Sequence, residues 1–405
     1  KVAMDGLWEH DDRSVIPVLV NVLRSEKGYE VRILDNLQSR VHPRGKPSWV
    51  PDEAEFTIGD VSNSTDLSSA LEGVHFALHL AAYQDYLPDF STFIHTNSES
   101  SALILELAVA EPQRYPLKKI VFASSQSVCG EGRYLCPACA GSIKPPPLVE
   151  QLERASDPLA SSYDFPEQAV WVPSPRSQNQ LRRRQWEPKC PKCGEEMSPL
   201  LSGEETVNPG TAYGISKYAI ELLADRLGRR YDIPTVCMRY TYVQGPRNSF
   251  YNAYSGIARR FALRLLNGLP PVVYEDGNQL RDYVNVRDVA RANVLVMEDP
   301  RANFQVFNVG GGRAVTVSEF ARMMLDAFNS NLKPLVRGEF RLGDTRHTVS
   351  DISKLRALGW EPTIPVEQNV VEYASWIREQ RHNGEFLEDA ERVMREYGVV
   401  GRADG

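Results

Sequence analysis

The sequence has no excess of basic side chains, since 46 Lys and Arg are outnumbered by 53 Asp and Glu and the formal net charge is −7. Proteins that bind nucleic acid or an anionic membrane surface need the opposite balance to neutralise phosphates. No run approaches the roughly 20 apolar residues of a membrane span. The first residues, with Asp5, Glu9 and Asp11, lack the pattern of a signal peptide. We therefore expect a cytoplasmic protein that binds neither nucleic acid nor membrane.

Cysteine is also scarce, with six in the chain, and four of the six form two Cys-x-x-Cys pairs. The pairs are Cys136 with Cys139 and Cys190 with Cys193. In a reducing compartment this arrangement favours metal binding over disulfides, and four thiolates suit a tetrahedral structural zinc ion with no open coordination position. The segment between the pairs is longer than in most zinc ribbons, and reduced thiols without metal are the alternative.

Short apolar runs rich in Val and Ile alternate along the chain with longer segments of helical periodicity. Such alternation is typical of a parallel sheet that helices cover on both faces. We therefore predict an α/β protein with a Rossmann-type, doubly wound parallel sheet, which binds ligands at the carboxyl ends of its strands. The predicted strands span residues 30–34, 75–80, 119–123 and 235–239, and the predicted helices span residues 66–71, 97–110 and 212–231.

Departures from the alternation define the predicted domains. Residues 133–203 contain both Cys pairs, three consecutive prolines and a polar stretch without periodicity, which indicates a cysteine-rich insertion. Beyond residue 245 the elements become short and mixed, and they end in a helical tail around residues 366–397. We expect a dinucleotide-binding domain in residues 1–244, interrupted by the insertion, and a smaller, mainly substrate-binding lobe in residues 245–405 with some elements interleaved in the core.

A Tyr-x-x-x-Lys pattern begins the helix predicted over residues 212–231, with Tyr213 and Lys217 four residues apart. Residues at this spacing share one helix face, so the Lys ammonium can lie beside the phenol. Free tyrosine has a pKa of about 10, and an adjacent cation stabilises its phenolate. The pair could therefore take a proton from a sugar hydroxyl, although ordinary surface pairs show the same spacing. Ser124 and Ser125 follow a predicted strand, either as site hydroxyls or as a simple strand-ending turn.

With these residues the sequence resembles the extended short-chain dehydrogenase/reductase family, and within it the nucleotide-sugar epimerases and dehydratases. The resemblance runs from about residue 30 to about residue 362 and is interrupted only by the insertion. The number of matching motifs, given next, and their order along the chain are not expected by chance. The matching motifs are Ile33 to Leu37, Gly59-Asp60-Val61, His79-Leu80-Ala81-Ala82, Thr96-Asn97, Ser124-Ser125, Tyr213 to Lys217, Arg239-Tyr240, Gly245-Pro246-Arg247, Arg281-Asp282-Tyr283-Val284, Asp288-Val289, Phe307 to Gly310 and Gly343-Asp344.

The resemblance implies NAD as the cofactor. Asp35, just past the second strand, would accept hydrogen bonds from the adenosine ribose hydroxyls, and its charge would repel the 2′-phosphate of NADP. Asp60 and Val61 would contact the adenine. The cofactor contacts that the resemblance implies are Asp35, Asn36, Asp60, Val61, Leu80, Ala81, Ala82, Ser124, Tyr213 and Lys217.

The same resemblance implies a catalytic set of Ser125, Tyr213 and Lys217. Tyr213 would act as base on the 4-hydroxyl of a nucleotide-linked sugar, Lys217 would tune it, and Ser125 would hydrogen-bond the reacting hydroxyl. Transient oxidation to a 4-keto sugar, followed by hydride return to its other face, would invert that carbon, with the cofactor carrying the redox chemistry. Arg281 and Arg341 would hold the diphosphate. The implied substrate contacts are Tyr83, Tyr242, Asn248, Arg281, Arg341 and Asp344, with Tyr251 and Asn252 as further candidates.

The insertion is similar to the cysteine-bearing lobe of one bacterial group in the family, the dTDP-L-rhamnose 4-epimerase-like proteins. The match lies in Gly130-Glu131-Gly132 with the first Cys pair and in Gln185-Trp186-Glu187 with the second. The resemblance also implies a dTDP- or UDP-sugar as substrate and a homodimer formed through two helices of each subunit.

Differences from the family keep other interpretations open. Its members begin with Gly-x-x-Gly-x-x-Gly, which brings a helix N-terminus to the NAD pyrophosphate, whereas Gly6 is the single glycine in residues 1–14. A catalytically silent sugar-nucleotide binder is therefore one alternative to an NAD-dependent 4-epimerase. A nucleotide-sugar 4,6-dehydratase or another extended short-chain dehydrogenase is the second alternative. Dehydratases commonly place an Asp-Glu pair after the catalytic Ser or Thr, and Gln126 and Ser127 follow Ser125 here, which disfavours dehydration.

Overall fold

A seven-stranded parallel sheet dominates the computed structural model, which describes residues 2–5, 15–39, 41–48, 50–85, 87–157, 163–248, 256–380 and 396–404. The strand order is β13-β9-β5-β4-β1-β2-β3, and all neighbouring pairs are parallel. The chain reverses its direction of travel between β1 and β4, as in doubly wound folds, which confirms the predicted fold class. The strands are β1 (Val2–Asp5), β2 (Val31–Asp35), β3 (Glu55–Ile58), β4 (Phe76–His79), β5 (Lys119–Ser125), β9 (Thr235–Tyr240) and β13 (Gln305–Val309).

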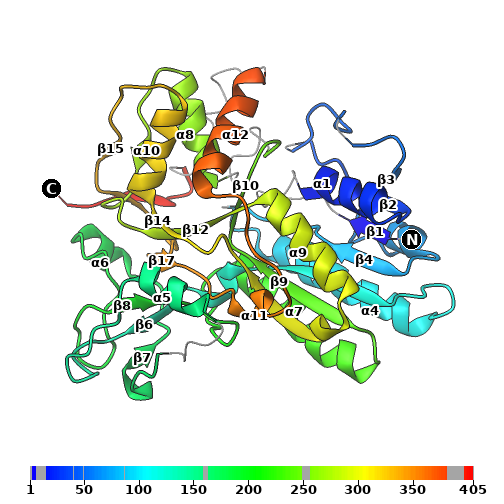
Figure 1. Ribbon diagram of the computed structural model, residues 1–405, viewed down its shortest axis with the longest axis horizontal. Helices are drawn as coiled ribbons and strands as arrows, with labels where there is room; N and C mark the ends of the chain where they lie inside the picture. Colours follow the sequence, from blue (N-terminus) through cyan, green and yellow to red (C-terminus); the bar gives the residue numbers. More distant parts are fainter. Residues whose placement is uncertain are drawn as a thin grey trace.

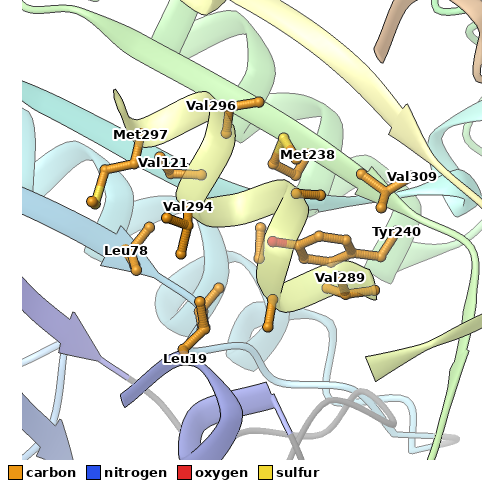
Figure 2. Close-up of a cluster of buried hydrophobic side chains, with 14 of the residues drawn as sticks. Leu19, Leu78, Val121, Met238, Tyr240, Val289, Val294, Val296, Met297 and Val309 are labelled. Atoms are coloured by element: carbon orange, nitrogen blue, oxygen red, sulfur yellow. The ribbon is translucent and has the colours of Figure 1, made fainter. Parts of the chain in front are cut away.

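One face of this sheet is covered by α1 and α9 (Figure 1). Figure 2 shows the buried cluster beneath them, in which Leu19 of α1 and Val289 of α9 join Leu78, Val121 and Met238 of the strands. Such burial of aliphatic side chains is the main stabilising term of the fold. The elements on this side are α1 (Val15–Asn21), the π-helical turn η2 (Val22–Glu26), α9 (Val286–Glu298), η6 (Pro300–Ala302) and α11 (Ser353–Arg356).

The other face is covered by α2, α4 and α7. Leu67, Ile104 and Ile220 from these helices pack against Ile120 and Phe122 of β5 in a second buried cluster. No helix in the described ranges has the length and apolar composition needed to span a bilayer. The elements on this side are α2 (Ser64–Leu71), α3 (Phe90–Phe93), the π-helical turn η3 (Ile94–Glu99), α4 (Ser100–Ala110) and α7 (Ala212–Arg230).

One predicted helix differs from the structure at its start. Residues 97–110 were predicted as one helix, but η3 precedes α4 and the regular helix begins only at Ser100. In η3 the side chain of Asn97 bonds to the backbone of Tyr83 and to Ser216 of α7, and single π-helical turns of this kind are frequent at functional sites. The helical tail predicted to residue 397 is seen as α12 as far as Glu379, and residues 381–395 lie outside the described part of the chain.

The second half of the chain builds a smaller mixed sheet of β10, β12, β14 and β17 against three helices. Phe261, Phe320 and Tyr373, one from each of α8, α10 and α12, share a third buried cluster. By contrast, β13 belongs to the large sheet and α9 packs against it, although both lie beyond residue 245. The elements are β10 (Tyr242–Gln244), α8 (Gly256–Leu266), β11 (Val272–Val273), β12 (Leu280–Asn285), β14 (Ala314–Thr316), α10 (Val317–Ala327), β15 (Leu335–Val336), β16 (Glu339–Arg341), β17 (His347–Thr348), α12 (Val366–Glu379) and β18 (Val400–Arg402).

The cysteine-rich insertion forms a small antiparallel sheet of its own, in the order β7-β6-β8. Figure 1 shows it in teal and green at the lower left, below α10 and β17 and far from the N-terminal strands. Tyr134 is fully buried in it, between the cysteines and Met197. The turn η4 (Gln126–Cys129) precedes the insertion, whose elements are β6 (Arg133–Leu135), α5 (Leu148–Ala155), η5 (Glu167–Ala169), β7 (Val170–Trp171), α6 (Gln178–Arg182) and β8 (Ser198–Leu200).

Candidate active site

The N-terminus of α7 positions the predicted Tyr and Lys. Thr211 caps the helix by accepting a 3.0 Å hydrogen bond from the Gly214 amide. One turn apart, Tyr213 and Lys217 are 5% and 1% exposed, and the Lys217 Nζ lies 5.7 Å from the centroid of the Tyr213 ring. The same Nζ donates to the carbonyl oxygen of Ala123 in β5 at 2.8 Å. The ammonium is thus fixed between the phenol and the end of the central strand.

The carboxyl end of β5 places Ser124 and Ser125 differently. Ser125 lines a cavity of about 220 Å³ together with Tyr213, and its Oγ accepts a 3.2 Å hydrogen bond from the Ser127 amide. Ser124 points away, because successive strand residues alternate sides, and its Oγ donates to buried Glu221. A contact between Ser124 and a cofactor would therefore use its backbone.

A second cavity, of about 270 Å³, gathers the predicted contacts for the adenosine half of a dinucleotide: Asp35, Asn36, Asp60 and Val61. Asp35 accepts a 2.6 Å hydrogen bond from the Leu37 amide, and the Asn36 side chain donates to Asp60 at 2.8 Å. The polar groups that would meet the ribose are thereby held in place. Leu80, Ala81 and Ala82 are buried just after β4, and residues 6–14, which include the glycine-poor loop, lie outside the described residues.

Tyr83 lies at the cavity that contains Asp35, although it was predicted as a substrate contact. Asn97 accepts from its amide at 2.6 Å and donates to its carbonyl oxygen at 3.0 Å and to Ser216 of α7 at 2.8 Å. The Tyr83 ring also packs edge-on against Phe93, in a cluster that includes Tyr213. Asn97 therefore ties the loop after β4 to the catalytic helix, a role that its place in a matching motif alone did not show.

The predicted diphosphate contacts meet at one carboxylate. Asp344 accepts hydrogen bonds from Arg341 at 2.9 Å and from Arg281 at 3.3 Å, and all three line the same cavity as Ser125. Burial would raise the pKa of Asp344, but the two guanidinium groups outweigh it and lower that pKa to about 2. Tyr242 lines this cavity too, with its ring 5.3 Å from the Arg281 guanidinium carbon. Burial raises the pKa of Tyr242.

Other predicted contacts lie elsewhere, and several cavity residues were not predicted. Asn248 is buried but does not line the cavity, and Tyr251 and Asn252 lie outside the described residues. Polar atoms of cavity-lining side chains that lack a hydrogen-bond partner among the described residues are Gln126 Oε1, Ser127 Oγ, Thr241 Oγ1 and Gln279 Oε1. Gln126, Ser127 and Thr241 directly follow the central strands β5 and β9, and this place at the carboxyl ends of strands is the sequence signal that could have identified them as site residues. Gln279 precedes β12 and carries no such signal.

The four paired cysteines converge in the insertion. All four Sγ atoms lie within 4.8 Å of one another, with Cys136 3.5 Å from Cys193 and Cys139 3.8 Å from both Cys190 and Cys193. A tetrahedral zinc ion with Zn–S bonds of about 2.3 Å separates its sulfurs by about 3.8 Å. None of the four is in a disulfide. The donor set therefore fits a structural zinc ion.

The parallel sheet, with candidate site residues at the carboxyl ends of its strands, has the architecture of doubly wound enzymes. Over residues 18–147 and 191–310 the sequence matches the NAD dependent epimerase/dehydratase family, and the chain belongs to this family. Between the matched segments, residues 148–190 from the middle of the predicted insertion are left out.

Similar proteins agree with this assignment. The chain is 25% identical to the dTDP-L-rhamnose 4-epimerase of Burkholderia thailandensis, over 86% of this chain and 88% of that protein. It is also 25% identical to a putative UDP-glucose 4-epimerase of Methanocaldococcus jannaschii, over 87% and 92%. The crystal structure of the UDP-glucose 4-epimerase of Thermus thermophilus with NAD shares the fold, with a TM-score of 0.66, 21% identity, and 94% and 100% of the two chains covered.

Proposed function

We propose that this protein is an NAD-dependent nucleotide-sugar 4-epimerase that acts through a transient 4-keto intermediate. The observation that carries the proposal is a single cavity lined both by Ser125 and Tyr213 and by Arg281, Arg341 and Asp344. One cavity thus contains residues suited to proton transfer at a hydroxyl and residues suited to binding a diphosphate. A nucleotide-linked sugar carries both groups. The names of the similar proteins support the same activity.

The chain's own residues divide the work on the sugar. Tyr213 takes the proton from the 4-hydroxyl and returns it when that hydroxyl forms again, and the Lys217 ammonium stabilises the phenolate between the two steps. Ser125, at the end of β5, hydrogen-bonds the reacting oxygen. Arg281 and Arg341 hold the diphosphate while the sugar turns over. When bound, NAD supplies the hydride acceptor and donor for the sugar carbon.

The residues around Asp35 fit NAD rather than NADP. Asp35 is 1% exposed and lies at the carboxyl end of β2, where a carboxylate suits the hydroxyls of a ribose and would repel a 2′-phosphate. Asn36, Asp60 and Val61 complete the wall of the same cavity. Lys217, in turn, would reach the ribose next to the nicotinamide.

We further propose that the four cysteines hold a structural zinc ion. The spacing of their sulfurs, described above, supports this, and a closed set of four thiolates leaves no position for substrate, so the ion would stabilise the insertion rather than take part in the reaction. Six cysteines with no disulfide between them also suit a reducing compartment such as the cytoplasm.

A homodimer through α7 and the segment packed against it completes the proposal. Ile215 and Leu222 of α7 are 51% and 43% exposed, and Phe90 and Ile94 of the adjacent α3 and η3 are 64% and 45% exposed. Exposed large apolar side chains on two helices that pack together are typical of a subunit interface. A dTDP- or UDP-sugar is the proposed substrate.

The proposal is tested with the purified protein in two steps. Nucleotide released on denaturation is identified and NAD is titrated calorimetrically, with Asp35→Ala as the variant expected to weaken binding. Then dTDP- and UDP-hexoses are incubated with the protein and the product is identified by NMR. Inversion at C4 supports the epimerase. A 4-keto-6-deoxy product would identify a dehydratase, and binding without turnover would identify a silent sugar-nucleotide binder.

A further inference from the structure

A buried charge network joins the cysteine-rich insertion to the substrate lobe. Its centre consists of Glu131, Arg176, Glu275 and Arg346, whose side chains are each no more than 2% exposed. Two guanidinium groups and two carboxylates are thus withdrawn from water together, which is tolerated only when each is paired and hydrogen-bonded. Glu187 extends the network at its rim, where it pairs with Arg346 and with His347.

Arg176 uses nearly all of its donors in this network. Its Nε donates to Glu131 at 3.2 Å, one Nη donates to Glu275 and to the Trp186 carbonyl oxygen at 3.0 Å each, and the other Nη donates to the Asp344 carbonyl oxygen at 2.8 Å. Only a planar fork can serve these acceptors at once. One side chain of the insertion therefore holds the backbone of a residue in the predicted diphosphate site.

The segment from Asp344 to Arg346 lies between this network and the phosphate-binding arginines. On one side Arg176 holds Asp344, and Glu131 accepts from the Arg346 amide at 2.8 Å. On the other side Arg281 donates to the carbonyl oxygens of Thr345 at 2.8 Å and Arg346 at 3.0 Å, while the Asp344 carboxylate binds both Arg281 and Arg341. A shift of this segment would move both arginines.

We propose that Arg176 is a positioning residue for the pair Arg281 and Arg341, so that the insertion is a working part of the diphosphate site. This inference rests on the proposed function, which assigns the diphosphate to these arginines. Arg176 itself is not among the residues that line the cavity, whereas its partner Glu131 is, and Arg176 therefore acts through Asp344 rather than on the substrate.

Arg176→Lys keeps the charge but loses the fork. We expect the Kd for dTDP or UDP, measured by calorimetry, and the KM for the nucleotide sugar to rise about tenfold, as for the loss of one charged hydrogen bond. The kcat should stay within about twofold and NAD affinity should not change, because Tyr213 and Lys217 lie on α7, outside the network. The matched control is Arg133→Lys, also in the insertion, whose 3.8 Å ion pair with Glu205 is exposed and should not matter.

Two further arms keep the outcome decisive. Should Arg176→Lys fail to fold, Glu187→Gln, at the more exposed rim, is expected to weaken dTDP or UDP binding in the same direction and less strongly. Arg281→Lys should weaken dTDP or UDP binding whether or not the inference about Arg176 is correct, provided that the proposed function holds. With Arg281→Lys impaired, two results for Arg176→Lys would overturn the inference and leave the proposed function standing. One is a normal affinity for dTDP or UDP, and the other is a loss of NAD binding equal to the loss of dTDP or UDP binding. Absence of dTDP and UDP binding in the wild type would overturn both.

Discussion

Tyr213 is held from several sides while still lining the cavity. Its ring packs in a cluster with Tyr83 and Phe93, and the Lys217 ammonium lies beside it, anchored on the Ala123 carbonyl oxygen. Fixed rings of this kind need little reorganisation at the moment of proton transfer. The geometry therefore suits a general base better than a packing residue.

Tyr213→Phe should lower kcat by about 10²- to 10⁴-fold, the usual contribution of a positioned base, because it removes the hydroxyl and keeps the ring. Binding of NAD and of dTDP or UDP, measured by calorimetry, should stay within about twofold. Tyr218→Phe, on the same helix and outside the cavity lining, is the control and should keep full activity. A Tyr213→Phe variant with wild-type kcat would refute the assigned role.

The pH dependence of Glu187 is a second prediction for a single residue. Burial would raise its pKa, but His347 and Arg346 outweigh this and lower it to about 2. Because the folded-state pKa lies below the unfolded value of about 4.3, its interactions stabilise the protein above pH 4 and are lost as the pH falls toward 2. Glu187→Gln should therefore be less stable than wild type by about 1–3 kcal/mol at pH 6, with a smaller difference at pH 3.5. Urea unfolding followed by tryptophan fluorescence measures this, and a difference independent of pH would contradict it.

At the scale of elements, the contact between α7 and the turn after β5 sets the distance between Tyr213 and Ser125. Gly214 permits this contact, because a Cβ there would lie 2.6 Å from the Ser127 carbonyl oxygen. Gly228 is equally crowded at the other end of the helix, where a Cβ would lie 2.6 Å from the Thr235 hydroxyl. The two glycines therefore pose the same packing problem at the site and away from it.

Gly214→Ala should shift the start of α7 and lower kcat by at least about tenfold, since small displacements of reacting groups are costly. Gly228→Ala should cost similar stability, about 1–3 kcal/mol, with kcat nearly unchanged. Steady-state kinetics and thermal melts of both variants test the argument. Equal kcat losses in the two would show that the effect is general loosening of the helix.

Elements were predictable where the signal is local. The spacing of Tyr213 and Lys217 needs only a helix, and the apolar runs of β5 and β9 needed only burial on both faces. The π-helical turn at η3 was not predicted, and the hydrogen bonds that Asn97 makes there with Tyr83 and Ser216 span 14 and 119 residues, so no local pattern in the sequence indicates them. The alternation of side chains along β5 could have shown that Ser124 and Ser125 point to opposite sides, whereas the partner of Ser124, Glu221, is 97 residues away and could not have been predicted.

On the scale of the whole molecule, the insertion is attached where substrate is proposed to bind. The contacts of Arg176 with Glu131, Glu275 and Asp344 span 45, 99 and 168 residues, and each partner looks in the sequence like an ordinary surface charge. Composition and motif spacing therefore predicted the fold, the proximity of Tyr213 to Lys217 and the cysteine cluster, but not the charge network between the insertion and the substrate lobe. Only the packing of distant segments reveals which charges are buried together.

The zinc proposal predicts about one equivalent of zinc in protein purified without chelator, measured by elemental analysis. Cys136→Ser should lose the metal and lower the melting temperature, because a structural site contributes its binding energy to folding. Cys129→Ser, a buried cysteine outside the cluster, should retain the zinc. Wild-type zinc content in Cys136→Ser would contradict the assignment.

The central claim, inversion of C4 by transient oxidation in one cavity, is tested most directly with a nucleotide sugar that carries deuterium at C4. The substrate is the dTDP- or UDP-hexose that the protein converts best, and the product is examined by NMR and mass spectrometry. The account predicts inverted C4 that keeps its deuterium, because the hydride leaves and returns within one closed site. Loss of the label to solvent, or its appearance at C6 of a 4-keto-6-deoxy sugar, would contradict it.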